Sequence, residues 1–275
     1  AGGRLQKSVS PRVAAMSFVK HTDVNRFGYE WERHYTLLPE HGAQFKKWVM
    51  PLTSADFAGK RVLDAGCGMG RNSYWAVQWG AKEVVAFDAD PRTVAAALRN
   101  LTQFPNARVL LKSIYDIYWR DEFDIAFSIG VIHHLEDPLA AVRKLTEAAK
   151  PGGKVAVWLY GYEGNEWIVT FVSPLRRLIT SRLPPALLYR LMYAASIPLY
   201  LFVKVVPTRS MYLSQLKGFK FRHIHLIVFD HFLPSIARYY RREEAVTLLA
   251  DAGLTDIVCT HCNNISWMVI GTKKS

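Results

Sequence analysis

Residues 62–70 read Val-Leu-Asp-Ala-Gly-Cys-Gly-Met-Gly, so a short apolar run ends in Asp64 and passes straight into three alternating glycines. A buried strand that leads through such a turn into a helix is typical of nucleotide-cofactor sites, because glycine lets the backbone bend sharply and approach a ligand closely. Asp64 offers an acceptor for a cationic group. The rival dinucleotide pattern G-x-G-x-x-G fits poorly, because its third small residue would fall at Arg71.

Three later segments continue the pattern as alternating strands and helices. Val84–Asp88 reads as a second apolar strand that ends in a carboxylate about 20 residues after the glycines, where a ribose diol needs an acceptor. Phe123–Pro138 reads as a strand, a His-His turn and a capped helix. Lys150–Gly153 is predicted to be a tight turn that begins the strand Lys154–Tyr160.

In this order and spacing, the segments resemble the class I S-adenosylmethionine-dependent methyltransferases, and most closely the small-molecule branch that carries V-L-D-x-G-C-G and V-x-H-H-L. The resemblance returns near the C-terminus, where Glu243–Ala252 is predicted to be a helix and Thr255–Cys262 and Ile265–Thr272 to be paired strands. It implies a Rossmann-like, doubly wound α/β sheet of seven strands, mostly parallel with the last strand antiparallel. It also implies S-adenosyl-L-methionine as cofactor and S-adenosyl-L-homocysteine as product.

On this basis the chain divides into four parts. Residues 1–57 form an N-terminal extension with lid helices, and residues 58–160 form the cofactor-binding core. Residues 161–242 form a helical insertion between strands five and six that caps the acceptor, and residues 243–275 complete the core.

The resemblance also implies which residues contact the cofactor. Its N-terminal segment would fold over the cofactor, which makes Tyr29 and Trp31 candidates for contact. Many relatives hold the adenine with an acidic residue after the third strand, but this chain has Lys112-Ser-Ile-Tyr-Asp116, so we expect residues 113–115 to hold it, with Asp116 as the alternative. The full set of expected contacts is Tyr29, Trp31, Asp64, Gly66, Cys67, Gly68, Asp88, Ala89, Ser113, Ile114, Tyr115, Ser128, Ile129 and His133.

The insertion carries nearly all of the charge excess. Residues 164–242 hold twelve Lys or Arg and two acidic residues, a net +10 of the chain's +12. A basic surface confined to one module indicates an anionic acceptor, an anionic membrane surface or nucleic acid. The uncharged run Leu191–Val203 is broken by Pro198 and is shorter than the roughly 20 residues that span a bilayer. We expect either an interfacial patch or, preferably, helices that cap the active site and bury their apolar face on the sheet.

Two pairs of side chains are candidates for the chemistry of transfer. His133 and His134 follow the fourth strand, at the edge where open α/β sheets bind ligands, and a neutral imidazole is a competent base near pH 7. Asp230 and His231 precede the closing helix and could orient and deprotonate an acceptor. Either pair could instead serve packing or capping.

We therefore expect methyl transfer to an O, N or C atom of a small-molecule acceptor that is anionic or hydrophobic. One alternative is an enzyme that works at a membrane surface on a quinone or a lipid headgroup. Another is a protein that binds S-adenosylmethionine without catalysis. Both a monomer and a homodimer fit the sequence.

Nucleic acid is not expected as a partner. Enzymes that methylate base amino groups carry a D/N/S-P-P-Y/F/W tetrapeptide after the fourth strand, but residues 128–131 read Ser-Ile-Gly-Val. No cysteine stands where the RNA cytosine-5 enzymes need their nucleophile.

A metal site is not expected either. Cys259-Thr-His-Cys262 lacks a second ligand pair, and in an extended strand its two thiols face opposite sides. Three cysteines give no disulfide framework and indicate a reducing compartment. Ala1–Ser10 shows no apolar core of signal-peptide length, so we expect a cytoplasmic location, with peripheral membrane contact as an option.

Overall fold

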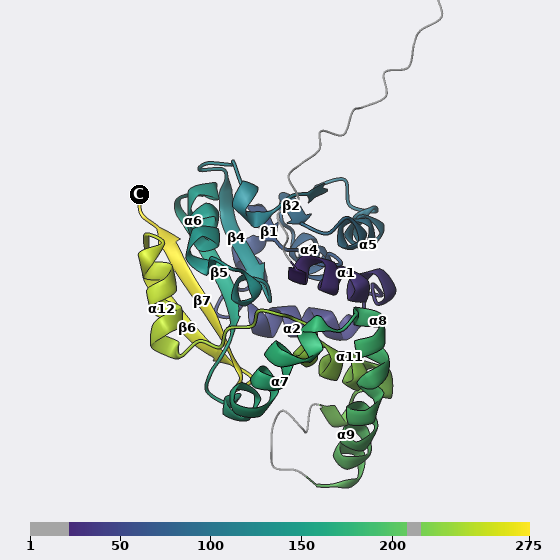
Figure 1. Ribbon diagram of the computed structural model, residues 1–275. Helices are drawn as coiled ribbons and strands as arrows, with labels where there is room; N and C mark the ends of the chain where they lie inside the picture. Colours follow the sequence, from purple (N-terminus) through teal and green to yellow (C-terminus); the bar gives the residue numbers. More distant parts are fainter. Residues whose placement is uncertain (1–21, 208–215) are drawn as a thin grey trace, which may run out of the picture.

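Seven strands form one sheet, in the order β3-β2-β1-β4-β5-β7-β6, in the computed structural model, which describes residues 22–207 and 216–275 (Figure 1). Neighbouring strands are parallel except at β7, which is antiparallel to both β5 and β6. This is the predicted doubly wound sheet. The predictions about Ala1–Ser10 lie outside the described residues. The strands are β1 (Arg61–Ala65), β2 (Glu83–Asp88), β3 (Ala107–Leu111), β4 (Phe123–Ile129), β5 (Ala149–Tyr160), β6 (Leu254–Cys262) and β7 (Ser266–Lys273).

Helices precede, cover and extend the sheet. Three lie before β1: α1 (Thr22–Arg33), α2 (Pro39–Trp48) and α3 (Ser54–Phe57). Those connecting the strands are α4 (Arg71–Gln78), α5 (Pro91–Leu101), η1 (Ile114–Asp116), η2 (Ile132–His134), α6 (Pro138–Ala148) and α12 (Arg242–Asp251). The insertion contains η3 (Ile168–Val172), α7 (Ser173–Leu178), η4 (Thr180–Arg182), α8 (Pro185–Leu191), α9 (Tyr193–Val205) and α11 (Phe221–Phe232). The four-part division of the chain stays a prediction.

Alternating side chains of the strands supply two hydrophobic cores, one on each face of the sheet. Leu63 and Val157 belong to the core shared with α6 and α12, whereas Val62 and Trp158 belong to the core shared with α2 and α4. Period-two alternation is what a sheet covered on both faces requires. It also separates the two thiols of the C-x-x-C motif as predicted, because one thiol packs against each core.

The predicted turn at Lys150–Gly153 is instead part of β5, which begins at Ala149. Phe123 pairs with Ala149, but two residues later Ile125 pairs with Lys154, so the strand bulges between these pairs. Gly152 has φ +73°, a left-handed conformation that lets the extended chain kink and rejoin the sheet. The prediction was wrong because the glycines bend the strand and do not precede it.

Helices α8 and α9 of the insertion pack against α11 and not on the sheet, which differs from the preferred interpretation of their apolar residues. In Figure 1, α8 and α9 lie away from the sheet. Within the described residues, α8 and α9 together form the one helical stretch, Pro185–Val205, long and apolar enough to cross a bilayer, which by itself is weak evidence of crossing. Only 17% of its most apolar window is buried.

Helix α1 joins the insertion to the rest of the chain. The buried Arg26 guanidinium donates hydrogen bonds to the carbonyl oxygens of Thr180, Ser181, Leu183 and Leu233. Three of these carbonyls belong to η4 or to the residue after it, and that of Leu233 follows the last residue of α11. A single N-terminal side chain therefore satisfies backbone groups from two parts of the insertion.

Candidate functional site

The loop between β1 and α4 has the conformation that its glycines predict. Gly66 has φ +77° and Gly68 has φ +55°, both left-handed. A β-carbon on Gly66 would lie 2.5 Å from a methyl of Val131, so no side chain fits there. The loop is tied to β2, because the amides of Gly66 and Cys67 both donate to the carbonyl oxygen of Phe87.

Two carboxyl groups lie at this loop: Asp64 is near the end of β1, and Asp88 is the last residue of β2. Asp64 is fully buried, and its Oδ2 accepts from the Ser73 hydroxyl while its Oδ1 has no partner among the described residues. The Asp88 carboxylate accepts from the amides of Gly68, at 3.1 Å, and of Asp90. Burial raises the pKa of Asp64 to about 7 and that of Asp88 to about 6, so a cationic ligand would stabilise their ionised forms.

Helix α1 closes over the loop. A β-carbon on Gly68 would lie 3.6 Å from Nε1 of Trp31, which places this predicted contact residue over the glycines. A β-carbon on Gly28 would lie 2.0 Å from Oδ2 of Asp90, so α1 approaches the start of α5 more closely than any side chain allows. Tyr29 points elsewhere, since its ring lies 6.3 Å from the ring of Phe229 in the insertion.

The remaining predicted cofactor residues fall into two groups. Cys67 and Ala89 lie on the loops after β1 and β2, next to the two carboxyl groups. The others carry local structural contacts. Ser113 caps η1, Ile114 is buried in the core, the Tyr115 hydroxyl bonds the backbone of Asp137, the Ser128 hydroxyl donates to the carbonyl oxygen of Ala65, and Ile129 packs in the second core.

A second cluster of charged groups lies beside the loop, formed by Glu30 of α1, Arg71 of α4 and Asp230 of α11. Burial raises the pKa of Glu30 well above its usual range, and the neighbouring Asp230 raises it further through its charge and a side-chain hydrogen bond. Burial likewise raises the pKa of Asp230. Arg71 interacts electrostatically with both carboxyls and with Asp64, so it connects this cluster to the glycine loop.

Both carboxyls of the cluster keep one oxygen without a partner. Oε2 of Glu30 and Oδ1 of Asp230 are shielded from water and form no hydrogen bond within the described chain. A hydrogen bond between two carboxyl groups requires that one of them carries a proton. Burial and the nearness of the two carboxyls therefore favour the protonated form of one of them.

The two predicted histidines of η2 have different surroundings. His133 is fully buried, and its ring lies 3.9 Å from that of Tyr160 and 4.2 Å from that of His134. Burial lowers the pKa of His133 well below its usual value, so the ring is neutral, although the backbone of Trp158 acts in the opposite direction. Neither ring nitrogen makes a well-formed hydrogen bond in the described chain. His134 Nδ1 is bonded to the carbonyl oxygen of Ile236 at 2.6 Å.

Asp230 and His231 have different surroundings, although they are neighbours in sequence. Asp230 meets Glu30, whereas the charge near His231 is Arg176, which with burial lowers the pKa of His231 to about 4. The buried Arg176 donates to the carbonyl oxygen of His231 at 3.2 Å. Successive residues of a helix point in directions about 100° apart, so the two side chains have different neighbours, and their role in the transfer stays a prediction.

Sequence reasoning missed Glu30, Arg71 and Arg176 as site residues. Their helices meet only in the folded chain. A charged residue on an amphipathic helix is normally predicted to lie on the face exposed to solvent. Arg71 alone had a local signal, because it occupies the place where a dinucleotide loop needs a small residue.

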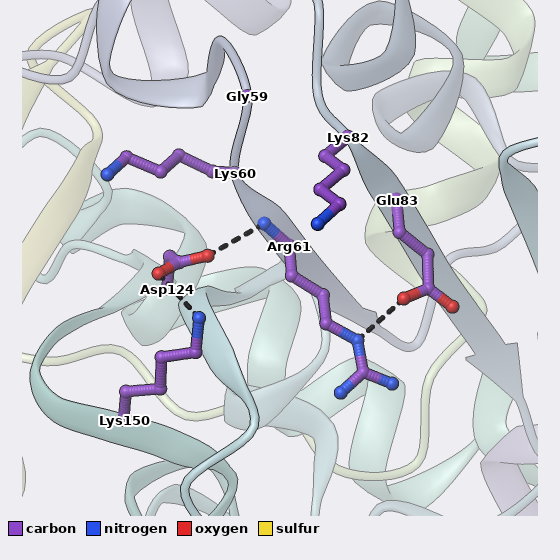
Figure 2. Close-up of a pocket in the computed structure, with 7 residues that line it drawn as sticks. All are labelled: Gly59, Lys60, Arg61, Lys82, Glu83, Asp124 and Lys150. Carbon is purple, nitrogen blue, oxygen red and sulfur yellow. Dashed lines mark hydrogen bonds and ion pairs between the residues drawn. The ribbon is translucent and has the colours of Figure 1, made fainter.

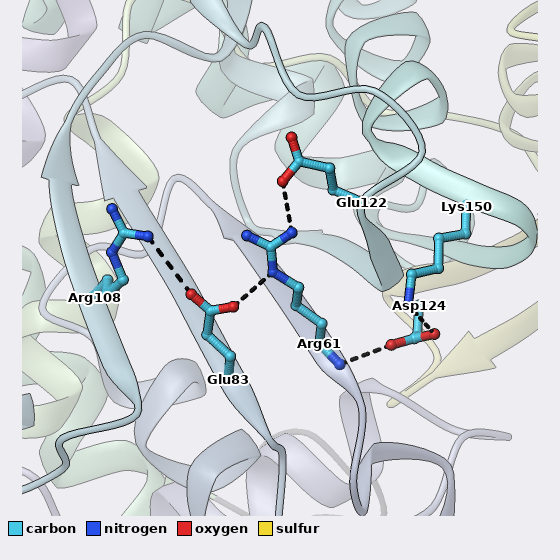
Figure 3. A network of polar contacts seen from close by, with 6 residues as sticks. All are labelled: Arg61, Glu83, Arg108, Glu122, Asp124 and Lys150. Carbon is cyan, nitrogen blue, oxygen red and sulfur yellow. Dashed lines mark hydrogen bonds and ion pairs between the residues drawn. The ribbon is translucent and has the colours of Figure 1, made fainter.

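A separate pocket of about 300 Å³ opens at the amino ends of the strands, opposite the glycine loop (Figure 2). Figure 3 shows ion pairs at this end of the sheet: Arg61 pairs with Glu83 and Glu122, each at 2.6 Å, and Lys150 pairs with Asp124 at 2.8 Å. Lys60 and Lys82 also line the pocket. These pairs join the starts of four strands. Open α/β sheets bind ligands at the carboxyl ends of their strands, so we assign this pocket a structural role.

Residues 63–157 match the model of a family described as a methyltransferase domain. A tRNA U34 carboxymethyltransferase from Campylobacter hominis is 28% identical over 145 residues, which cover 50% of this chain and 48% of that protein. One from Pseudomonas paraeruginosa is 31% identical over 123 residues, which cover 43% of this chain and 38% of that protein. The chain thus spans about half the length, or less, of the curated relatives it matches.

Among solved structures, magnesium protoporphyrin IX methyltransferase from Synechocystis PCC 6803, with bound S-adenosylhomocysteine, is similar with a TM-score of 0.51 and 14% identity. The likeness covers 95% of this chain and 90% of that one. At this identity it shows the fold alone.

The prediction that nucleic acid is not a partner was wrong, because the relatives with the matching domain are named as enzymes of tRNA. It rested on the missing proline tetrapeptide, which belongs to enzymes that modify the amino groups of adenine or cytosine. Uridine has no such group, so the absence of the motif says nothing about it.

Proposed function

We propose that this chain, which carries a class I S-adenosylmethionine-dependent methyltransferase domain, transfers a methyl group to an oxygen or nitrogen of a small-molecule acceptor bound beside the carboxyl cluster. The matched domain and the sheet order confirm the predicted family, its fold and its cofactor. The acceptor and the residues that handle it are the proposal.

The residues at the glycine loop fit this cofactor. Its positive charge suits the buried Asp64, whose Oδ1 has no partner in the described chain, and its ribose diol suits the Asp88 carboxylate beside Gly68. Trp31 then covers the loop and excludes water from it. When bound, S-adenosylmethionine supplies an electrophilic methyl group on a charged sulfur.

An acceptor hydroxyl or amine must lose a proton, and the carboxyl cluster can take it. Burial raises the pKa of both Glu30 and Asp230, and the member of the pair that is ionised would accept the proton of the acceptor. Their raised pKa values bring them nearer to neutral pH, where a carboxylate is a stronger base. Arg71 interacts with both carboxyls and stabilises the ionised member.

The observation that carries this proposal is the pair of shielded oxygens on Glu30 and Asp230 that have no partner in the described chain. A buried polar atom without a hydrogen bond lowers the free energy of unfolding by about 1–3 kcal/mol. The two oxygens are therefore expected to destabilise the folded chain. They lie on α1 and α11, beside the residue that follows the glycine loop. An acceptor bound there would satisfy them.

A uridine of tRNA is the second candidate acceptor. The relatives that share the matched domain are named for transfer to U34 of tRNA, and the net +10 of residues 164–242 would attract a phosphate backbone. Those names specify a carboxymethyl group, so this candidate includes a different transferred group.

One experiment separates these functions. The purified chain is titrated with S-adenosylhomocysteine by calorimetry, then incubated with methyl-labelled S-adenosylmethionine and either a small-metabolite extract or unmodified tRNA transcripts. Label in an extract component that wild type transfers and Glu30→Gln does not would support the proposal. Label in tRNA alone would replace it with methyl transfer to tRNA. Tight S-adenosylhomocysteine binding without transfer to either pool would contradict the proposal, and would leave a carboxymethyl donor or a non-catalytic binding protein.

A further inference from the structure

Exposed apolar side chains are concentrated on one part of the molecule. Nineteen large apolar residues are exposed in the described chain, and thirteen of them lie between Trp167 and Val206. Water-soluble surfaces usually scatter such residues singly, and contiguous ones mark interaction sites. The thirteen are Trp167, Phe171, Leu175, Leu178, Ile179, Leu187, Leu191, Tyr193, Ile197, Leu201, Phe202, Val205 and Val206.

Helices α8 and α9 are apolar on both of their faces. Leu188 and Val203 are buried, where these helices pack against α11 and its neighbours. The opposite face carries Leu187, Leu191 and Leu201 at helical spacing and ends at Val205, which is 76% exposed. A helix that is apolar all round is expected inside a core or in contact with lipid, and here the second face has no protein cover in the described chain.

A second apolar stripe runs along η3 and α7. Trp167, Phe171 and Leu175 recur every four residues and are exposed, with Phe171 at 72%. Ile168 and Val172 between them are buried. This segment therefore also turns one apolar face inward and another outward.

The same stretch contains no acidic residue. Between Glu166 and Asp230 the sequence has nine Lys or Arg and no Asp or Glu. Within the described residues, none of these cations forms a salt bridge with a carboxylate, and Arg177, Arg182 and Arg190 are exposed beside the apolar stripes. The outward face thus combines apolar side chains with unneutralised positive charge.

We propose that these two stripes dock on the surface of an anionic phospholipid bilayer, with the apolar side chains in the interfacial layer and the cations at the headgroups. Interfacial helices combine such an apolar face with basic residues. Spanning is disfavoured, because α8 and α9 would have to leave α11. A second copy would bring the same positive charge against itself, and RNA would leave the aliphatic side chains unmatched.

This inference goes beyond the proposed function and is measured without it, by binding alone. The full chain is floated with phosphatidylcholine vesicles and with vesicles that also contain phosphatidylglycerol, at low and at high salt. We expect binding to the anionic vesicles that weakens as salt rises, because the Debye length shortens.

Three double variants locate the surface. Leu201→Gln with Val205→Gln removes apolar contact and should weaken binding to anionic vesicles at both salt concentrations. Arg177→Gln with Arg190→Gln should weaken binding roughly tenfold or more at low salt and little at high salt, because each basic residue near an anionic surface contributes about 1 kcal/mol. The matched control is Leu98→Gln with Leu111→Gln, two exposed residues outside the insertion, which should bind like wild type.

Each contrary result identifies another occupant. No vesicle binding by a folded wild type would overturn the proposal. A wild-type dimer that Leu201→Gln with Val205→Gln converts to a monomer, without vesicle binding, would assign the stripes to a second copy. Binding to tRNA that depends on the two arginines but not on Leu201 and Val205, again without vesicle binding, would assign the surface to RNA. Circular dichroism of each variant confirms that it folds.

Discussion

The glycine-loop half of this protein and the half formed by α1 and the insertion differ in how their apolar side chains are covered. Near the loop, Asp88 bonds two backbone amides, Ser73 bonds Asp64, and the apolar residues of the strands are covered. In the second half, many apolar side chains face outward, whereas shielded polar atoms without partners in the described chain occur in both halves.

This difference reflects what each half does for a ligand. The loop is built to approach a ligand closely with backbone groups that are already oriented. The second half contributes outward apolar side chains and the Glu30 and Asp230 carboxyls, each of which has a shielded oxygen with no partner in the described chain. A buried polar group without a partner is costly, so its retention points to a use.

The largest effect should come from the carboxyl cluster. Glu30→Gln or Asp230→Asn removes the group that takes the acceptor proton, and we expect a fall in the transfer rate of about 10²–10⁴-fold, the usual size of general-base catalysis. Affinity for S-adenosylhomocysteine should change little. The measurements are single-turnover rates and calorimetry.

The matched control for that prediction is Glu32→Gln on the same helix, where Glu32 is exposed and pairs only with Arg33 within the described chain. It should transfer at the wild-type rate. If both cluster variants also kept full rate while His133→Gln lost it, the base would be His133 and the contrast between the two halves would be wrong.

The next effect concerns the loop itself. Asp88→Ala removes a charged acceptor at the Gly68 amide, and we expect S-adenosylhomocysteine to bind about tenfold to a hundredfold more weakly, since a hydrogen bond to a charged group contributes about 1.5–3 kcal/mol. Asp116→Ala is the control, because Asp116 is exposed. Loss of affinity in the control instead would assign ligand contact to the segment after β3.

Gly28→Ala tests whether α1 is held against α5. Alanine normally stabilises a helix interior by about 1 kcal/mol over glycine. Here its β-carbon would meet the Asp90 carboxylate, which is held by Arg92, so we expect a loss of about 1–3 kcal/mol in unfolding free energy and weaker S-adenosylhomocysteine binding. Denaturant titration and calorimetry measure both.

Rescue would identify the clash as the cause. Serine at position 90 keeps a helix cap but is shorter. Gly28→Ala combined with Asp90→Ser should therefore recover part of the lost affinity. An increase in stability from Gly28→Ala alone would mean that α1 stands away from Asp90.

The smallest effect is on pH dependence. Burial raises the pKa of Asp64 to about 7 and of Asp88 to about 6, and a cationic cofactor favours their ionised forms. Binding therefore releases protons, and the affinity should fall by up to roughly tenfold as pH drops from 8 to 6. Calorimetry in two buffers of different ionisation enthalpy counts the protons. Asp64→Asn should flatten the upper part of this profile, whereas an unchanged profile would show that Asp64 titrates elsewhere.

Much of the loop half was predictable because its signals are local. The spacing from Gly66 to Asp88 and the alternation of apolar residues both act within one or two adjacent elements. The positive φ of Gly152 shows the limit, since a glycine pair reads the same whether it ends a strand or bends it.

The second half was less predictable because its contacts join distant segments. Glu30 lies beside Asp230 although 200 residues separate them in the sequence, and the periodicity of neither helix predicts this contact. The outward face of α8 and α9 has the same composition as a buried one. Only the arrangement of neighbouring helices decides which of the two it is.

The four carbonyl bonds of Arg26 have a consequence for the position of α1. Helix α1 holds the insertion through Arg26, covers the loop with Trp31 and supplies Glu30. The same twelve-residue helix thus contacts the glycine loop, the carboxyl pair and the insertion, so a change in the position of α1 would alter all three together.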